Sequence, residues 1–391
     1  MKLTAGIYDP YLDTLGGGER YCLTLAEILI KNGYQVDLFW SGDPNIIKLA
    51  EARFNLNLSA INIKPDIFNA PSNNLELVED PSTLSQVTSH HLRPPSLLNK
   101  ITAFFTKIKT TQKYDLIFFL SDWSIPFLFS KNNLLHLQVP LKTNYSLKQK
   151  LLNLVKLLFI RKIICNSHFT YKIASSYFGS KCLTVYPPID TAKFDPTQTK
   201  SNTIISVGRF DDILNIKKQD VIIEAFKKFI TQNNQTDWRL VLAGGSLEAP
   251  EKNSYLQHLQ HLGLNLPIEF VVNPTFTELK ELYATAKIYW HAAGYQVDES
   301  LHPEHTEHFG MTPVEAMASG LVPLLVKKGG LPEIITDGVD GYLWTDPSEL
   351  VAKTQLLIAS PDTLTQMAQA AIVKSQSFSK DNFQQSLSPL F

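Results

Sequence analysis

The 391-residue sequence has only three cysteines, Cys22, Cys165 and Cys182, which lie far apart and form no Cys-x-x-Cys pair. This spacing argues against a disulfide framework and against a zinc site, and it favours buried free thiols. No uninterrupted apolar run approaches the roughly 20 residues of a membrane-spanning helix. The first residues contain too short an apolar stretch for a secretory signal. We therefore expect an intracellular, cytoplasmic protein.

Acidic residues are almost missing from residues 81–189, where 14 Lys and Arg face only Asp115 and Asp122. In residues 1–195, 21 basic and 15 acidic residues give a net charge of +6, and the remaining 15 and 22 give residues 196–391 a net charge of −7. The total of 36 basic and 37 acidic residues excludes a nucleic-acid-binding polycation. Two differently charged domains fit this asymmetry.

One basic segment also has the pattern of an amphipathic helix. Residues 142–162 carry Lys142, Lys148, Lys150, Lys156, Arg161 and Lys162 among leucines and a valine. Such a helix can lie on an anionic membrane surface, where each Lys or Arg adds about 1 kcal/mol of attraction. It can equally pack on the core with its lysines in solvent, or supply a positive field for a phosphate-bearing substrate. The sequence leaves these three interpretations open.

Short β-rich apolar runs alternate with helical patterns along the whole chain, which is typical of parallel βαβ units. The predicted strands are residues 3–8, 35–40, 115–120, 133–137 and 162–166 in the first half, and 203–207, 239–243, 268–272, 288–291 and 322–326 in the second half. The fold class is therefore α/β, with two tandem Rossmann-like doubly wound domains.

A proline-rich stretch, residues 186–197, interrupts this pattern in mid-chain, because proline removes an N–H donor and fixes the backbone. It predicts an N-terminal domain over residues 1–197 and a C-terminal domain over residues 198–376. Doubly wound sheets bind ligands at the carboxyl ends of their strands, so we expect the active site in the cleft between the domains.

The first motif with chemical meaning is a glycine-rich turn, Gly16-Gly17-Gly18, directly after the first predicted strand. Glycines let a backbone approach a ligand, and the helix that follows offers its N–H groups to a phosphate. The turn lacks the Gly-x-Gly-x-x-Gly spacing of a dinucleotide-binding site, which argues against an oxidoreductase. A tight strand-to-helix connection is the structural alternative.

The second motif combines Arg209, at the end of the predicted strand 203–207, with Lys217 and Lys218 at the start of the next helix. Guanidinium and ammonium groups in such a place can hold a diphosphate. The sequence has no Asp-x-Asp pair to bind a metal ion, so these cations are the candidates for stabilising a diphosphate leaving group. They could equally be surface cations.

The third motif places Glu307 and Glu315 eight positions apart around Gly310, with Pro313 in the first turn of a helix. Such carboxylates can accept hydrogen bonds from sugar hydroxyls, while the N–H groups of the loop and helix start face a phosphate. Alternatively, Glu315 only favours the dipole of its helix.

With these motifs the sequence resembles the retaining glycosyltransferase family 4 (glycosyl transferases group 1), of the glycosyltransferase B (GT-B) fold, over nearly the whole chain. The resemblance is carried by residues 16–19, 166–170, 185–190, 208–209, 224–226, 242–245, 307–317 and 329–334. Residues 377–391 are similar to the last helix of the family, which crosses back to the N-terminal domain, so we expect a complete chain.

The resemblance implies roles for the first two motifs. Gly16 and Gly17 would approach the diphosphate of the donor. Arg209 and Lys217 would neutralise that diphosphate as it departs, with Lys218 as the alternative second cation.

For the third motif, the resemblance implies that Glu307 contacts the transferred sugar and that Glu315 binds the ribose hydroxyls. The other implied donor-binding residues are Val272 and Asn273 near the base, and Phe309, Gly310, Met311 and Thr312 around the sugar and phosphate. In this family the acceptor is usually thought to attack from the front face, which needs no separate general base.

One position departs from the family pattern. The family usually has a histidine after the strand read as 133–137, and here Gln138 occupies that slot, with His136 two positions earlier on the same strand face. Glutamine can hydrogen-bond to a sugar but cannot become a cation. Either residue is a candidate, and His136 is also a candidate for core packing.

Histidines and carboxylates in the region of His291, His302, Glu304 and His305 raise the question of a metal site. Their spacing fits no familiar ligand pattern, so we expect a loop that lines the donor pocket and no metal.

The sequence thus predicts a retaining, metal-independent glycosyltransferase that moves a hexose from a UDP- or GDP-sugar to a hydroxyl of a glycan or lipid-linked acceptor, without a cofactor. Its partners would be the nucleotide sugar, the acceptor and an anionic membrane surface through residues 142–162, with no nucleic acid. The alternative, motivated by Gln138, is a catalytically silent sugar-nucleotide-binding or membrane-associated module. A sugar-nucleotide epimerase or a phosphorylase of the same fold is the third hypothesis.

Overall fold

A computed structural model describes residues 2–68, 97–211, 217–233, 237–246 and 248–391. By its internal contacts the chain divides into two compact units. The first comprises residues 1–136, 145–163 and 390–391, and the second comprises residues 137–144 and 164–389. The domain limits expected from the proline-rich stretch and the crossing of the last helix stay predictions.

The first sheet has seven strands in the order β3-β2-β1-β4-β5-β6-β7. Its strands are β1 (Thr4–Tyr8), β2 (Gln35–Phe39), β3 (Ile61–Lys64), β4 (Leu116–Ser121), β5 (Asn132–Leu137), β6 (Lys162–Cys165) and β7 (Cys182–Thr184). The helices of this part of the chain are α1 (Gly17–Lys31), α2 (Ile46–Phe54), α3 (Leu97–Thr111), α4 (Leu147–Leu157) and α5 (His168–Phe178).

The second sheet has six parallel strands in the order β10-β9-β8-β11-β12-β13. They are β8 (Thr203–Val207), β9 (Arg239–Gly244), β10 (Ile268–Val272), β11 (Ile288–His291), β12 (Val322–Val326) and β13 (Tyr342–Trp344). The helices are α6 (Gln219–Asn233), α7 (Ser254–Leu262), α8 (Phe276–Thr285), α9 (Met311–Ala318), α10 (Pro347–Ala359), α11 (Pro361–Ser375) and α12 (Lys380–Leu387).

The prediction of an α/β fold with two Rossmann-like doubly wound sheets is confirmed. All ten predicted strands are present, each within one residue of its expected limits at either end. The three strands that the sequence did not predict, β3, β7 and β13, are edge strands of three or four residues.

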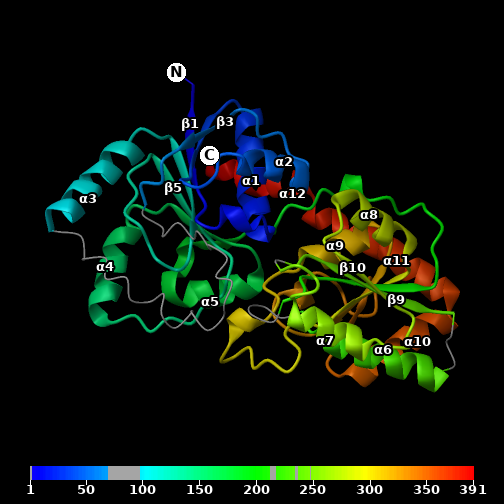
Figure 1. Ribbon diagram of the computed structural model, residues 1–391. Coiled ribbons are helices and arrows are strands. Elements are labelled where there is room, and N and C mark those ends of the chain that lie inside the picture. Colours follow the sequence, from blue (N-terminus) through cyan, green and yellow to red (C-terminus); the bar gives the residue numbers. More distant parts are fainter. Residues whose placement is uncertain (1, 69–96, 212–216, 234–236, 247) are drawn as a thin grey trace. The chain divides into compact units, whose positions relative to one another are not determined.

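Helices cover both faces of the second sheet, with α6, α7 and α10 on one side and α8, α9 and α11 on the other (Figure 1). Strands that face helices on both sides have no solvent face, and all five residues of β8 are buried. The strand order reverses between β8 and β11, so the crevice at their carboxyl ends is the place where a doubly wound sheet binds its ligand.

No helix among the described residues is both long and apolar enough to cross a membrane.

Candidate active site

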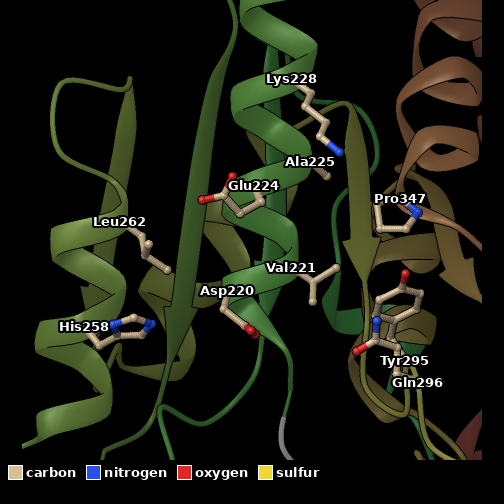
Figure 2. Close-up of a pocket in the computed structure, with 10 residues that line it drawn as sticks. All are labelled: Asp220, Val221, Glu224, Ala225, Lys228, His258, Leu262, Tyr295, Gln296 and Pro347. Atoms are coloured by element: carbon tan, nitrogen blue, oxygen red, sulfur yellow. The ribbon is translucent and has the colours of Figure 1, made fainter.

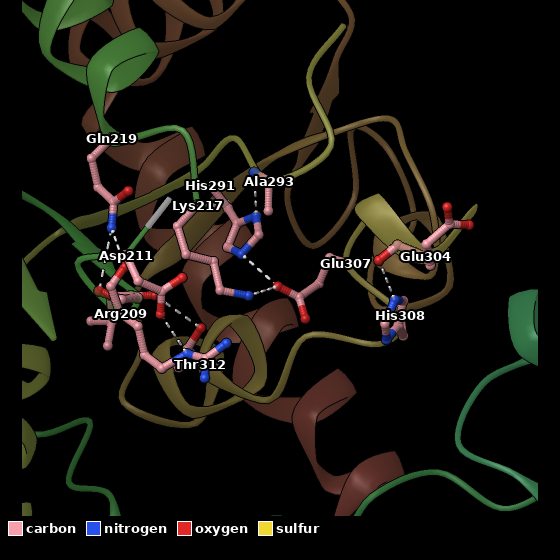
Figure 3. A network of polar contacts seen from close by, with 12 residues as sticks. Arg209, Asp211, Lys217, Gln219, His291, Ala293, Glu304, Glu307, His308 and Thr312 are labelled. Carbon is pink, nitrogen blue, oxygen red and sulfur yellow. Dashed lines mark hydrogen bonds and ion pairs between the residues drawn. The ribbon is translucent and has the colours of Figure 1, made fainter. Parts of the chain in front are cut away.

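A cluster of three charged or titratable side chains lies at the carboxyl ends of β8 and β11. The Lys217 Nζ atom lies 2.7 Å from Glu307 Oε2, and the Nε2 atom of His291 lies 3.3 Å from the same oxygen (Figure 3). These side chains are only 18%, 14% and 3% exposed. The structure thus brings together Glu307 and Lys217, which the sequence placed 90 positions apart in separate motifs.

Backbone packing directs the Lys217 side chain to this place. The stem of Lys217 crosses the face of Gly208, where a Cβ atom would lie 2.6 Å from Lys217 Cγ. Gly208 in turn lies against Gly244, whose added Cβ would come within 1.9 Å of the Gly208 carbonyl oxygen. These close approaches explain the glycine of the Gly-Arg motif after β8 and the first glycine of the Gly-Gly motif at the end of β9.

The cluster keeps Glu307 ionised. Burial alone would raise the pKa of Glu307, but the Lys217 ammonium and the contact from His291 outweigh it and hold that pKa well below its ordinary value. Burial lowers the pKa of His291, although Glu307 opposes this effect. The site therefore contains a carboxylate, an ammonium group and a neutral imidazole.

The tautomer of His291 follows from its second nitrogen. The backbone N–H of Ala293 donates to Nδ1 of His291 at 3.3 Å, so the proton of the neutral ring is on Nε2, which faces Glu307. From the sequence we placed His291 in a region that raised the question of a metal site and that we expected to line the donor pocket, without a role of its own. Its position as the last residue of a strand at the switch point was the signal for a role in the site.

Arg209 directly follows Gly208, and its side chain is half exposed. Its Nε atom lies 3.2 Å from Asp211 Oδ2, and its carbonyl oxygen accepts a hydrogen bond of 2.9 Å from the amide of Gln219 (Figure 3). Gln219 opens α6 and also donates to the carbonyl of Gly208 at 3.3 Å. The Gln219 side chain thus fixes the turn that carries the predicted diphosphate cation, a role that the sequence analysis missed.

The two adjacent lysines now have separate surroundings. Lys217 is paired with Glu307, whereas Lys218 has a left-handed backbone with φ of +54° and directly precedes α6. The insert of residues 211–216, because of which the sequence left Lys217 and Lys218 as alternatives, lies outside the described residues from residue 212 on.

Helix α9 begins at an N-terminus that no side chain caps. Gly310 precedes it with φ of +103°, and an added Cβ would lie 2.9 Å from Leu331 Cδ2, so only glycine fits there. Among the described residues, the N–H groups of Phe309 and Gly310 have no backbone hydrogen-bond partner. Helix geometry leaves those of Met311 and Thr312 without one as well. This arrangement can bind an anion.

Two buried tyrosines make hydrogen-bond contacts with side chains of α9. The hydroxyls of Thr312 and Tyr289 lie 2.8 Å apart, and Tyr283 donates to Glu315 Oε2 at 3.4 Å. Glu315 is buried. Phe309 is buried too and packs on Tyr186, so this residue can offer a ligand its backbone rather than its ring.

The predicted base-binding residues end strand β10. Asn273 has φ of +53°, and its side-chain oxygen accepts a hydrogen bond of 2.8 Å from the N–H of Ser246. Val272 is half-buried beside it. Asn273 thereby ties the loop after β10 to the loop after β9, on the same edge of the sheet as Glu307.

The glycine-rich turn belongs to the first unit. Gly16 precedes α1 and donates its N–H to Glu19 Oε2 at 2.5 Å, and Thr14 donates to the same oxygen at 2.9 Å. Glu19 is buried, which raises its pKa. Gly17 is exposed at the first turn of α1, and the contact of Gly16 and Gly17 with a donor stays a prediction.

The two candidates for the histidine slot differ in their surroundings. His136 is fully buried and stacks on Tyr21, with ring centroids 4.0 Å apart, so it has the packing role considered for it. Gln138 is half-buried just after β5, and its carbonyl oxygen accepts a hydrogen bond of 3.0 Å from Asn166. Of the two, Gln138 has the more accessible side chain.

Among the described residues, one group of side chains has the donors to hold a metal ion. Nδ1 of His302 and Nε2 of His305 lie 3.2 Å and 3.7 Å from Glu304 Oε1, and all three donor atoms lie within 4.8 Å of one another. Both histidines are exposed. His308 Nε2 lies 3.1 Å from the Glu304 carbonyl, which ties the group to the loop before α9 (Figure 3).

A cavity of about 300 Å³ lies beside α6 (Figure 2). Asp220 and Glu224 of α6, His258 of α7 and Tyr295 are among its lining residues. None of the predicted site residues lines it.

Two family models match successive parts of the chain. Residues 15–193 match the model described as Glycosyltransferase Family 4, and residues 189–374 match the model described as Glycosyl transferases group 1. The two matches together extend over most of the chain.

Curated relatives match part of the chain. A Xenopus laevis protein named GDP-Man:Man(3)GlcNAc(2)-PP-Dol alpha-1,2-mannosyltransferase is 30% identical over 236 residues, which are 53% of this chain and 44% of that protein. A D-inositol 3-phosphate glycosyltransferase of Corynebacterium diphtheriae is 29% identical over 192 residues, 47% of this chain and 40% of that protein. The chain thus spans less than half the length of these two relatives.

Solved structures match the chain from end to end. The Anabaena protein HepE in complex with UDP aligns with a TM-score of 0.67 at 18% identity, over 100% of this chain and 99% of that chain. A glycosyltransferase from Rickettsia africae aligns with a TM-score of 0.73 at 16% identity, over 100% and 97%. At these identities the likeness shows a common fold.

Proposed function

Because the chain belongs to the family 4 glycosyltransferases of the GT-B fold, we propose that it is a retaining, metal-independent enzyme that transfers a hexose from a nucleotide diphosphate sugar to an acceptor hydroxyl. The observation that carries the proposal is the buried cluster of Glu307, Lys217 and His291 at the switch point of the second sheet.

Glu307 is suited to hold the transferred sugar. An ionised carboxylate accepts hydrogen bonds from several hydroxyls, and the Lys217 contact fixes its orientation before any donor binds. Glu315, about one turn into α9, would take the ribose hydroxyls, and Val272 and Asn273 would contact the base.

The leaving diphosphate would be stabilised by protein charges. Lys217 has three N–H donors and can hold Glu307 and a phosphate oxygen at once, while the half-exposed Arg209 can exchange its partner Asp211 for a second oxygen. The uncapped N-terminus of α9 adds N–H donors and a positive dipole end. These groups are in place before the reaction, so they stabilise the developing charge without reorganisation.

In the proposed step the acceptor hydroxyl attacks the anomeric carbon from the face that the diphosphate leaves. The bond from that carbon to the phosphate oxygen breaks, the glycosidic C–O bond forms, and the acceptor proton passes to the departing phosphate oxygen. This course retains the anomeric configuration and needs no carboxylate as a separate base.

The donor and acceptor classes draw on the relatives. The Xenopus protein is named for GDP-mannose and a dolichol-linked glycan, and HepE was solved with UDP, so we propose a UDP- or GDP-hexose as donor. For the acceptor we propose a hydroxyl of a glycan or lipid-linked molecule. A lipid-linked acceptor would place the enzyme at the cytoplasmic face of a membrane, where residues 142–162 would meet anionic lipid.

One observation favours a second function. Gln138 replaces the usual histidine, which is compatible with a catalytically silent sugar-nucleotide-binding module. The presence of Arg209, Glu307 and Glu315 together favours the enzyme instead.

The test is nucleotide release from a panel of UDP-, GDP- and ADP-sugars in EDTA, with lipid extract as acceptor. We expect release from one donor, loss of release in Glu307→Ala, and full release in Glu269→Ala, which removes an exposed carboxylate paired with Arg239 in the same unit. A thermal shift by a donor without any release would support the silent module. Release that requires added Zn²⁺ would instead refute metal independence and point to the His302 group.

A further inference from the structure

Helix α4 turns a ridge of leucines toward solvent. Leu147, Leu151, Leu154 and Leu158, at and just beyond the helix, are 76%, 59%, 62% and 79% exposed. The spacing of four, three and four residues keeps them within about 60° of one another at 100° per residue. Scattered single exposed leucines are ordinary, but four in one line form a continuous apolar surface.

The buried contacts of this segment lie at the C-terminal end of α4. Leu157 is buried there, and Ile160 is buried just after the helix. Lys156 also points inward, with its Nζ atom 5.3 Å above the Phe127 ring, and burial lowers its pKa. The exposed leucines contradict the interpretation of this segment as a helix packed on the core with its lysines in solvent, although Lys148 and Lys150 are exposed as it expected.

Two lysines flank the leucine ridge. On a helical wheel Lys148 and Lys150 lie about 80° to either side of its centre, and both are exposed. No Asp or Glu occurs between Asp122 and Asp190, so no acidic residue of α4 or its neighbouring segments pairs with them. A helix with an apolar ridge between two flanking cations has the chemistry of a helix that lies in a lipid interface.

Exposed aromatic rings continue the apolar surface toward α3. Phe105 is 62% exposed, and Phe104 packs edge-on against Phe127 with centroids 5.6 Å apart. Phe127 also contacts Phe159, which follows α4. The surface therefore extends over two helices of the first unit and is not a feature of one side chain.

We propose that the α4 ridge inserts into the interface of an anionic bilayer, with the leucines among the acyl chains and Lys148 and Lys150 on lipid phosphates. The charges select this occupant. Two copies of the chain joined through their ridges would bring four lysines together without a carboxylate, whereas an anionic lipid surface supplies a partner for each. The proposal extends the proposed function, because it would bring the site to a lipid-linked acceptor.

The experiment is co-sedimentation of the full chain with vesicles of phosphatidylcholine alone or with one quarter phosphatidylglycerol. We expect binding to the anionic vesicles that weakens in high salt. Leu151→Gln/Leu154→Gln should weaken it at least 20-fold, and Lys148→Glu/Lys150→Glu should reduce it to the level of neutral vesicles. The control Leu356→Gln, at a leucine of α10 that is also 62% exposed, should bind like the wild type.

Other results would overturn the proposal. Binding by the leucine variant as tight as that of the wild type would show that the ridge does not enter the lipid. Absence of vesicle binding, together with a dimer that the leucine variant abolishes in sedimentation equilibrium, would assign the ridge to a second copy. Donor hydrolysis in detergent-free buffer is measured on each variant, and we expect it unchanged, which separates this proposal from the proposed function.

Discussion

The pair between Glu307 and Lys217 offers the sharpest test of the site. Glu307→Gln keeps the shape and one acceptor oxygen but removes the charge. At 2.7 Å the gross Coulomb attraction is about 6 kcal/mol for an effective dielectric of 20. Desolvation of the two charges opposes most of this attraction. Breaking such a largely buried pair should therefore lower the free energy of unfolding by about 3 kcal/mol, mainly because Lys217 is left without its counter-charge.

The kinetic consequence is larger for kcat than for KM. Glu307 is held in place before the donor binds, and loss of one preorganised electrostatic group costs about 10²–10³ in kcat. We therefore expect nucleotide release by Glu307→Gln to fall by about that factor, with KM changed less than fivefold. The assay is release from the active donor in EDTA, and Glu269→Gln is the matched control on the exposed Arg239 pair.

A double-mutant comparison shows whether the two residues act as a unit. If they do, Lys217→Gln/Glu307→Gln should be no more than about threefold slower than Glu307→Gln, because groups that act together lose their effect together. The reasoning fails if Glu307→Gln keeps kcat within threefold of the wild type. It also fails if the two single losses simply multiply.

Three further outcomes follow from the same part of the structure. Gly310→Ala should lower Tm and reduce kcat about 100-fold. The control Gly338→Ala, at φ of +78° with no atom closer than 4.0 Å to the added Cβ, should lower Tm alone. Equal kcat values of the two variants would contradict a role for the loop shape. Arg209→Gln should lower kcat/KM about 100-fold, while Asp211→Asn, which frees Arg209 from a half-exposed pair, should change it less than threefold in either direction. Burial lowers the pKa of His291, so on acidification the unfolded chain takes up a proton before the folded protein does. The free energy of unfolding should therefore fall as the pH drops below the ordinary His pKa of 6.5. If denaturant titrations from pH 8 to pH 5 show as large a fall in His291→Gln as in the wild type, His291 is not the group responsible.

Most of the fold could be predicted because central strands carry a strong local signal. β12 is buried along its whole length and is an unbroken apolar run, and the equally buried β8 has only Thr203 and Ser206 among its apolar residues. The strands that were missed lie at the sheet edges, where β7 and β13 are only three residues long. Such segments owe their conformation to the neighbouring strand, which the local sequence does not contain.

The site was predictable in its members but not in its pairings. Spacing around Gly310 identified Glu307 and Glu315, and the strand ends identified Arg209 and Lys217. Nothing in the spacing indicates that Lys217 crosses Gly208 to reach Glu307, because that contact depends on how two crossovers pack at the switch point.

The sequence alone also does not determine the role of His291, because a histidine at the end of a strand is equally compatible with packing, metal binding and catalysis. Its role depends on two contacts that the sequence cannot show. Ala293 fixes the proton on Nε2, and that atom faces the carboxylate of Glu307.

Helix α4 is a second case. The period of its leucines is the same whether the ridge faces the core or the solvent. The structure decides this case, because the four leucines are exposed whereas Leu157 and Ile160, at the end of the helix and just after it, are buried. In both cases the sequence supplies the right chemistry on the right element, and the tertiary contacts choose which face of it acts.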